Sequence, residues 1–322
     1  MLDYLGQKQV AYENARRPRF ILQSKNAMGA SKTVMLVLYK EGQEGKGRPS
    51  DIMLRRFVTA SPGNPYAFTN LVCDATAVAE NGQTVCVDGA QNMSSVTPTV
   101  TTDSMGDPNV DDPYGAVKVV EWVQTPANLS DPSWLNPYDD ARAHRGGINA
   151  DFVVMGFSYT PNWAAARNGN DKYDFYVRRS FDGGQTWTTD PNPTDPAAVY
   201  ETCNTWTYPS GTQSPGTKAE VCTTYAAGVF EQMRNLSQLS NAKSSVIEPR
   251  IVAVPGTVKD PATGLWTGIP EDKQNKAVYY VAYGISTNPK KDPVTKEQDD
   301  SVPLDLFYSF TRDRGENYVL DS

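Results

Sequence analysis

A long-range repeat constrains the fold of this chain more than any other feature of its sequence. The run FVVMGFS (152–158) returns as YVAYGIS (280–286) and, more loosely, as VMLVLYK (34–40). Each run is short, apolar and rich in β-branched or aromatic residues, which is typical of a strand buried on both faces. We therefore expect three widely spaced copies of one β-sheet unit.

Each run has a strand after it and a segment before it that repeat as well. The following strands open on aspartate: DIMLRRF (51–57), DFYVRRS (174–180) and DLFYSFT (305–311). Each preceding segment carries an arginine, namely Arg19, Arg145 and Arg250, so that the repeats are 126 and 105 residues apart. Because a four-stranded propeller blade takes only about 40–50 residues, we expect each period to hold two blades.

Three such periods, at about 16–140, 141–246 and 247–322, predict one all-β domain with the architecture of a six-bladed β-propeller. The third period stops soon after its second strand, so we expect the last blade to be incomplete or to be closed by residues outside this chain. Stacked blades bury faces that a lone sheet would leave exposed. The composition agrees, since 24 Gly and 23 Pro among 322 residues favour turns over long helices.

A compact polar motif follows two of the strands that open on aspartate. SFDGGQTW (180–187) fits S-x-D-x-G-x-T-W, and TRDRGENY (311–318) repeats it with conservative changes. The motif positions are Ser180, Asp182, Gly184, Thr186 and Trp187, then Thr311, Asp313, Gly315, Asn317 and Tyr318. Hydroxyl and carboxylate groups suit a tight turn, glycine permits a positive φ, and the aromatic ring covers the hairpin. We predict a structural role, with a metal or ligand role as the alternative.

This motif resembles the Asp-box of sialidase-like β-propellers. Together with its EPRIV and NLS segments, the chain is similar to bacterial surface proteins that carry a sialidase-like propeller domain. The resemblance implies that Asp-boxes lie in hairpins on the outer part of the blades, far from a central pocket. Sialidase activity would need three arginines on the substrate carboxylate, a Tyr–Glu nucleophile pair and an acidic residue as acid and base.

The ligand-binding candidates are Arg19, Arg145 and Arg250, with His144 as a further donor. Each arginine begins the expected innermost strand of its period, so the three can converge near an axis, and guanidinium groups pair bidentately with carboxylates. The alternative is that they lock neighbouring blades through acidic neighbours.

Those acidic neighbours are Asp139 and Asp140 for Arg145, and Glu248 for Arg250. The N-terminal RPRF departs from the Arg-Ile-Pro motif of active sialidases, and no tyrosine with a partner glutamate stands out. We assign no catalytic residue and favour a protein that is not an enzyme.

The four cysteines form two local pairs, Cys73 with Cys86 and Cys203 with Cys222. None belongs to a CxxC motif, and a single histidine does not complete the usual zinc set. We predict two disulfides and therefore an extracellular, cell-surface or periplasmic location, with free buried thiols as the alternative. The N-terminus lacks the pattern of a signal peptide, so we expect a fragment or the mature portion of a longer precursor.

The net charge of −7 argues against a nucleic-acid partner, and no apolar run approaches the length of a membrane span. We expect no cofactor other than calcium, for which the weak candidates in one acidic loop are Asp103, Asp107, Asp111 and Asp112. A solvated loop is the alternative for that segment. Asn92, Asn128 and Asn235 lie in N-x-S sequons.

The function that we expect is a non-catalytic extracellular β-propeller that acts as a binding or assembly module for a glycan or protein partner. The alternatives are a sialidase or other glycoside hydrolase that binds an acidic sugar through the arginines, and a structural subunit of a larger extracellular assembly.

Overall fold

The structure is a computed structural model. It describes residues 14–22, 34–42, 49–59, 68–69, 72–78, 84–87, 89–102, 117–133, 135–149, 151–161, 163, 166, 173–193, 200–207, 219–239, 244–253, 257–268, 277–286, 290–291, 298–299 and 304–319. The elements assigned in these residues are β-strands and one short 3-10 helix, η1 (Pro126–Ser130). The predicted all-β class is therefore confirmed, and no described helix is long and apolar enough to cross a membrane.

Sheet 1 contains the first repeat. Its strands are β1 (Asn14–Leu22), β2 (Val34–Gly42), β3 (Ser50–Thr59), β4 (Phe68–Thr69) and β7 (Gln91–Asn92). Strands β1, β2 and β3 pair antiparallel in chain order, and β4 and β7 each pair with β3. The run that was predicted as a buried strand forms β2 at the centre of this sheet.

Sheet 2 repeats this arrangement with the second copy. Its strands are β10 (Asp140–Asn149), β11 (Phe152–Thr160), β12 (Asp174–Ser180) and β15 (Arg234–Asn235), paired antiparallel in that order. Every residue of β11 and β12 is buried, because this sheet has a neighbour on each face.

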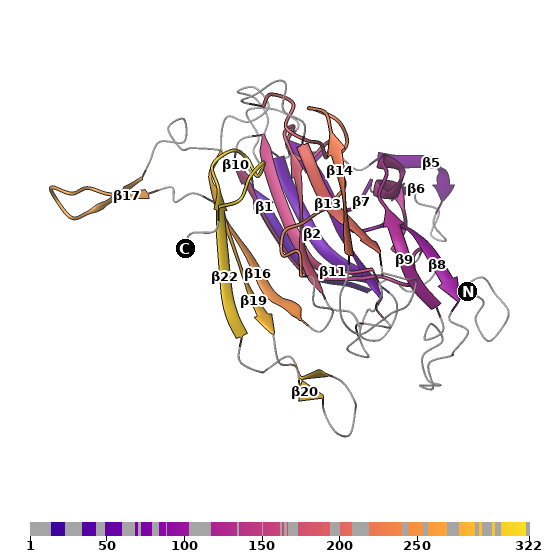
Figure 1. Cartoon of the computed structure of the whole chain (residues 1–322). Helices are drawn as coiled ribbons and strands as arrows, with labels where there is room; N and C mark the ends of the chain where they lie inside the picture. The colour runs from indigo at the N-terminus through magenta and orange to yellow at the C-terminus, as the bar shows by residue number, and fades with distance from the viewer. Residues whose placement is uncertain are drawn as a thin grey trace.

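Sheet 3 consists of β16 (Ser245–Ala253), β19 (Tyr279–Ser286) and β22 (Leu304–Thr311), again antiparallel. In Figure 1 it lies at one side of the molecule in orange and yellow, on the side from which the β17–β18 hairpin projects. Its third strand is the last strand of the sheet in the described part of the chain, whereas sheets 1 and 2 continue to β7 and β15.

Two-stranded ribbons occupy the rest of the first two periods, where the sequence predicted a second blade, and in the third period they lie between the strands of sheet 3. They are β5 (Val72–Val78) with β6 (Thr84–Val87), β8 (Thr97–Thr102) with β9 (Val117–Val123), β13 (Tyr200–Thr207) with β14 (Ala219–Tyr225), β17 (Thr257–Lys259) with β18 (Trp266–Gly268), and β20 (Lys290–Lys291) with β21 (Gln298–Asp299). Each period therefore holds one sheet of long strands in the described residues, and the six-bladed ring stays a prediction.

The two cysteine pairs lie in these ribbons. Cys73 is the register partner of Cys86 across β5 and β6, and Cys203 is the register partner of Cys222 across β13 and β14. Directly opposed positions of an antiparallel pair bring Cβ atoms about 4.5–5.5 Å apart. This register is compatible with the predicted disulfides, which stay a prediction.

Two hydrophobic cores hold the three sheets together. The first lies between sheets 1 and 2 and includes Leu36, Leu38, Met155, Tyr159 and Trp122, whose indole packs edge-on against the Tyr159 ring. The second lies between sheets 2 and 3 and includes Val154, Phe175, Val177, Val281 and Ile285. Sheets stacked face to face are thus the organising feature of the fold.

Candidate functional site

A β-bulge interrupts the first strand of all three sheets at the same place. The register shifts between Arg16 and Arg19, between Arg142 and Arg145, and between Ile247 and Arg250. Inside each bulge one residue has a positive φ, namely 55° at Arg17, 56° at Ala143 and 53° at Glu248. Positive φ is uncommon outside glycine, and bulges re-aim the side chains that follow them. A threefold bulge therefore presents each candidate arginine in the same way.

The three bulged strands meet along the inner side of the sheets, where β10 contacts both β1 and β16. The Nε2 atom of His144 lies 2.8 Å from the carbonyl oxygen of Arg17 and fastens β10 to β1. Burial and the positive charges of Arg19 and Arg250 lower the pKa of the Arg145 guanidinium to about 10. The structure thus brings Arg19 and Arg250 close enough to Arg145 for their charges to act on it.

The arginines have fewer acidic partners than the blade-locking alternative requires. Arg250 pairs with Glu248 at 2.5 Å, as that alternative predicts. Arg145 donates to the carbonyl oxygen of His144 at 2.8 Å. In the described residues neither Arg145 nor Arg19 forms an ion pair with a carboxylate. The cluster therefore retains unneutralised positive charge that an anionic ligand can use.

Asp139 and Asp140, the expected partners of Arg145, lie elsewhere, so this expectation is wrong. Asp140 accepts hydrogen bonds from the hydroxyls of Ser50 at 2.5 Å and Tyr173 at 2.6 Å. Asp139 accepts a hydrogen bond from the Tyr159 hydroxyl at 3.2 Å. Asp140 is the first residue of β10 and Asp139 precedes it, so both lie before the bulge that presents the arginine.

His144 is fully buried and has a structural environment. Burial lowers the pKa of its imidazole to about 4, so the ring is neutral near pH 7. A neutral imidazole has one N–H, and donation from Nε2 to the Arg17 carbonyl uses it. The ring positions β10 against β1 instead of offering a further donor to a ligand.

The first Asp-box forms the tight turn that its residues suggest. The Ser180 hydroxyl donates to the Asp182 carboxylate at 2.8 Å and accepts from the Gly184 amide at 2.8 Å. Asp182 also accepts from the amide and the hydroxyl of Thr186, at 2.9 Å and 2.6 Å. Gly184 has a φ of 83°, and the Trp187 side chain is buried.

The second Asp-box repeats this hydrogen-bonding pattern. The Thr311 hydroxyl donates to Asp313 at 2.7 Å and accepts from the Gly315 amide at 2.9 Å. Asn317 donates to Asp313 through its backbone amide at 3.0 Å and its side-chain amide at 2.8 Å. Tyr318 takes the place of the tryptophan, and its hydroxyl hydrogen-bonds to that of Tyr279.

Both Asp-box loops also dock onto the preceding sheet, which the sequence did not reveal. The first loop contacts sheet 1, where Arg56 Nε donates to the Gly183 carbonyl at 2.9 Å and the Trp187 indole donates to Gln91 at 2.6 Å. The Gln91 amide in turn donates to the Gln185 carbonyl at 3.2 Å. The Asp-box loop therefore closes its own hairpin and also connects two sheets.

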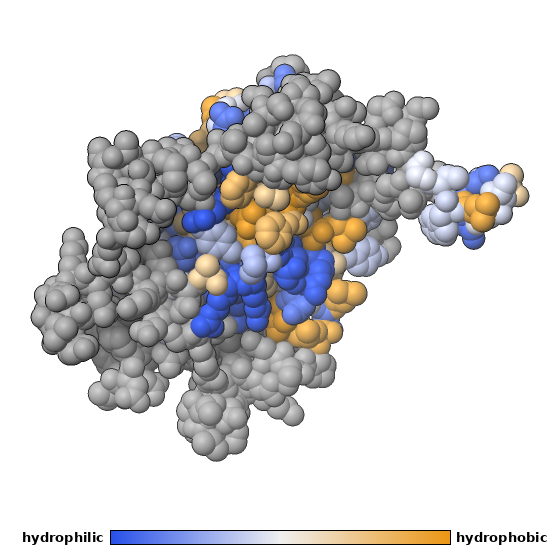
Figure 2. Space-filling model, turned by 180° about the vertical axis from the view of Figure 1, so that it is seen from behind, coloured by the Kyte–Doolittle hydropathy of each residue, from blue (hydrophilic) through white to orange (hydrophobic). Residues whose placement is uncertain are grey.

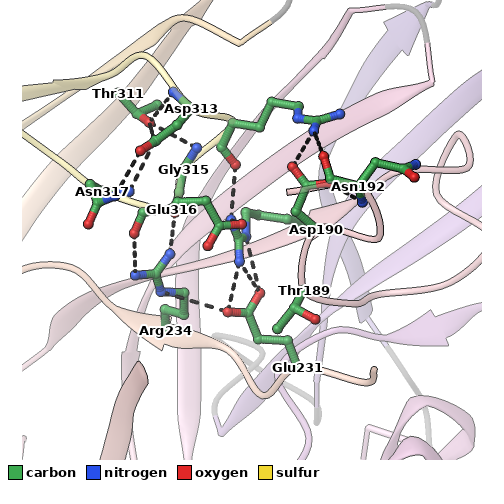
Figure 3. A network of polar contacts seen from close by, with 12 residues as sticks. Thr189, Asp190, Asn192, Glu231, Arg234, Thr311, Asp313, Gly315, Glu316 and Asn317 are labelled. Carbon is green, nitrogen blue, oxygen red and sulfur yellow. Dashed lines mark hydrogen bonds and ion pairs between the residues drawn. The ribbon is translucent and has the colours of Figure 1, made fainter. Parts of the chain in front are cut away.

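The second loop contacts sheet 2 through the ionic network of Figure 3. Arg179 is fully buried and pairs with Glu231 at 2.9 Å and with Glu316 of the loop at 2.8 Å. Arg234 donates to the carbonyl oxygens of Gly315 and Glu316. Arg56 and Arg179 occupy equivalent positions, five residues after the aspartate that opens each strand, so the repeated Arg-Arg of β3 and β12 was the available signal.

The remaining candidates are untested or lie in buried positions. The calcium candidates Asp103, Asp107, Asp111 and Asp112 lie outside the described residues. Within the described part of the chain, no group of three His, Cys, Asp or Glu side chains is arranged to hold a metal ion. The sequon asparagines Asn92, Asn128 and Asn235 are buried.

Comparison with known protein families, with curated proteins and with solved structures finds no match for this chain.

Proposed function

We propose that this protein is a non-catalytic extracellular module of the β-propeller type that binds an acidic group of a glycan or protein partner at Arg19, Arg145 and Arg250. One observation supports the proposal: equivalent bulges precede the three arginines, and the charges of Arg19 and Arg250 lower the pKa of Arg145. A cluster of like charges destabilises the folded protein. Groups with perturbed pKa values of this kind gather at functional sites.

Carboxylate and sulfate groups fit this cluster best. Arg145 and Arg19 offer guanidinium donors that form no ion pair with a described carboxylate, while Glu248 pairs with Arg250 and also lies near enough to Arg145 to raise its pKa. Planar guanidinium groups recognise oxyanions bidentately, and a second or third arginine adds charge without adding an acceptor. An extracellular setting, with the cysteine pairs closed as disulfides, belongs to the same proposal.

The test is binding to a glycan array that contains sialylated, uronate and sulfated sugars, followed by calorimetry on the best ligand. Arg145→Gln should weaken binding by about tenfold or more, because a hydrogen bond to a charged group contributes about 1.5–3 kcal/mol. Affinity should also fall as salt rises. Arg312→Gln is the matched control, since it removes one exposed guanidinium from the far end of β22.

Equal losses in the two variants, or binding that ignores both, would contradict the proposal. Turnover of a fluorogenic sialoside or uronide that Arg145→Gln abolishes would instead favour the glycosidase alternative. Binding restricted to neutral glycans would show that the arginine cluster does not form the binding site.

A further inference from the structure

A short strand with an Asn-x-Ser sequence completes sheets 1 and 2 in the same way. Strand β7 pairs Asn92 with Met53, and strand β15 pairs Asn235 with Tyr176. In both sheets the paired residue lies two positions after the aspartate that opens the third strand. The two sequons are therefore equivalent structural elements.

The serine of each sequon locks onto that aspartate with the same geometry. Ser94 donates to the Asp51 carboxylate at 2.7 Å, and Ser237 donates to the Asp174 carboxylate at 2.7 Å. Each serine hydroxyl also accepts the amide of the residue that follows the aspartate, at 2.9 Å in both sheets. One hydroxyl thus satisfies a carboxylate and a backbone N–H at the edge of the third strand.

Two further contacts repeat. The amide of the middle sequon residue, Met93 or Leu236, donates at 2.7 Å to the carbonyl of the residue after the aspartate. The asparagine oxygen accepts the amide three residues later, at 2.9 Å in the first copy and 3.0 Å in the second. Two independent copies with matching atoms and distances define a receptor on the third strand and a ligand on the fourth.

Sheet 3 has the receptor without the ligand. Its third strand opens on Asp305, which pairs with Ile285 through the backbone ladder but whose exposed carboxylate has no hydrogen bond or ion pair with a described residue. The next residue, Leu306, is 75% exposed, whereas the equivalent Ile52 and Phe175 are buried completely. Residues 312–322 contain no Asn-x-Ser sequence.

The exposed apolar side chains at this edge agree with the absence of a fourth strand beside β22 among the described residues. Leu304, Phe307 and Tyr308 are exposed as well. The outer edge of β22 pairs with Val319 at Phe310, and no described strand pairs with that edge at residues 304–308. Figure 2 shows hydrophobic surface on the side of the molecule from which the β17–β18 hairpin projects, the side on which Figure 1 places β22. Exposed edge strands of this kind normally have a partner or a protective charge.

We propose that β22 binds an extended segment with an Asn-apolar-Ser sequence as a fourth strand of sheet 3. The serine donates to Asp305, the asparagine pairs with Phe307, and the apolar residue donates its amide to the Leu306 carbonyl. This is β-strand addition, in which main-chain hydrogen bonds give affinity and side-chain contacts give specificity. A second copy of this chain fits less well, because its own β7 and β15 already occupy equivalent receptors.

The test attaches a copy of residues 231–241, EQMRNLSQLSN, to the C-terminus of the full chain through a Gly/Ser linker, which raises the effective concentration of the segment. The extension should raise the melting temperature by about 2 °C or more. Alanine in place of the serine that corresponds to Ser237, or Asp305→Ala in the chain, should abolish the rise. The exposed Lys259→Ala on β17 is the matched control and should retain it.

The same segment as a free fluorescent peptide gives a second readout by anisotropy. Asp305→Ala should weaken its binding about tenfold or more, as expected for a hydrogen bond to a charged group. The peptide with alanine for serine should then bind both proteins equally, because the two changes remove one interaction. Equal stabilisation by both extensions, additive losses in this cycle, or a concentration-dependent dimer that Asp305→Ala disrupts would each overturn the proposal.

Discussion

The two contacts between successive sheets use the same loop but different chemistry. Between sheets 1 and 2 the Asp-box loop is held by hydrogen bonds: Arg56 donates to the Gly183 carbonyl, and Gln91 bonds the Trp187 indole and the Gln185 carbonyl. Between sheets 2 and 3 the equivalent loop is held by ion pairs of Arg179 with Glu231 and Glu316. A repeated motif therefore fixes where two sheets meet but leaves the chemistry of the contact open.

The buried charges of the two contacts also differ in balance. Arg179 is matched by opposite charges: burial lowers the pKa of its guanidinium, but Glu231 and Glu316 outweigh that effect and raise it. Between sheets 1 and 2, burial raises the pKa of Asp51 to about 7 and that of Asp139 well above its usual range, and each lies near further carboxylates. The first contact should therefore respond to pH and the second to the loss of a partner.

The largest effect should come from Arg179→Met. Two glutamates would remain buried without their cation, and breaking a buried ion pair in this way costs about 3–5 kcal/mol of unfolding free energy. Urea denaturation measures the loss. Arg312→Met should cost less than about 0.5 kcal/mol because its guanidinium is exposed, and a similar loss in both variants would show that the network does not matter.

The Asp51 carboxyl should make the free energy of unfolding depend on pH, by about 3 kcal/mol. Its pKa is raised in the folded state, so the folded protein retains a proton that the unfolded chain releases above about pH 4. The stability that this proton contributes is complete below pH 4 and is lost as pH rises through about 7. Asp51→Asn should flatten the decline of unfolding free energy between pH 4 and 8.

The control for this pH effect is an aspartate with the opposite shift. Hydrogen bonds from Thr186 and Ser180 outweigh burial and lower the pKa of Asp182. Its contribution is present above about pH 4 and is lost as pH falls further. Asp182→Asn should therefore leave the decline between pH 4 and 8 unchanged. A decline that persists in Asp51→Asn would assign it to other groups.

The smallest effect should come from Gln91→Ala, which removes the neutral contact of the first loop. The Trp187 indole N–H would lose its acceptor, at a cost of about 1 kcal/mol in unfolding free energy. Denaturation in low and high salt provides the comparison with the ionic contact. The loss should not depend on salt, and a strong salt dependence would mean that the two contacts are not distinguished by charge.

Much of the local structure could be predicted from the sequence. The apolar runs became the central strands β2, β11 and β19, since short β-branched and aromatic runs bury well on both faces. The Asp-box residues formed two turns with matching hydrogen bonds, because their hydroxyl, carboxylate and glycine act within a few residues of one another. Local spacing is enough to predict interactions that are local.

The sequence failed where the partner lies far along the chain. Asp140 stands five residues before Arg145, yet it bonds Ser50 and Tyr173 because β10 packs against sheet 1 at that point. The pairing of Arg179 with Glu316 spans 137 residues, and the repeated Arg-Arg of β3 and β12 indicated the position of the arginine but not its partner. Nearness in sequence was a poor guide to ion pairs.

The amino-acid sequence by itself determined the repeat, the all-β class and the two Asp-box turns, because each depends on the period and chemistry of neighbouring residues. Only the tertiary structure decided that equivalent bulges precede the three arginines, that Asp140 bonds Ser50 and Tyr173 instead of Arg145, and that the Asp305 side chain has no serine partner among the described residues. Those outcomes depend on which strands become neighbours in space, and burial then sets which charges are matched and which remain available.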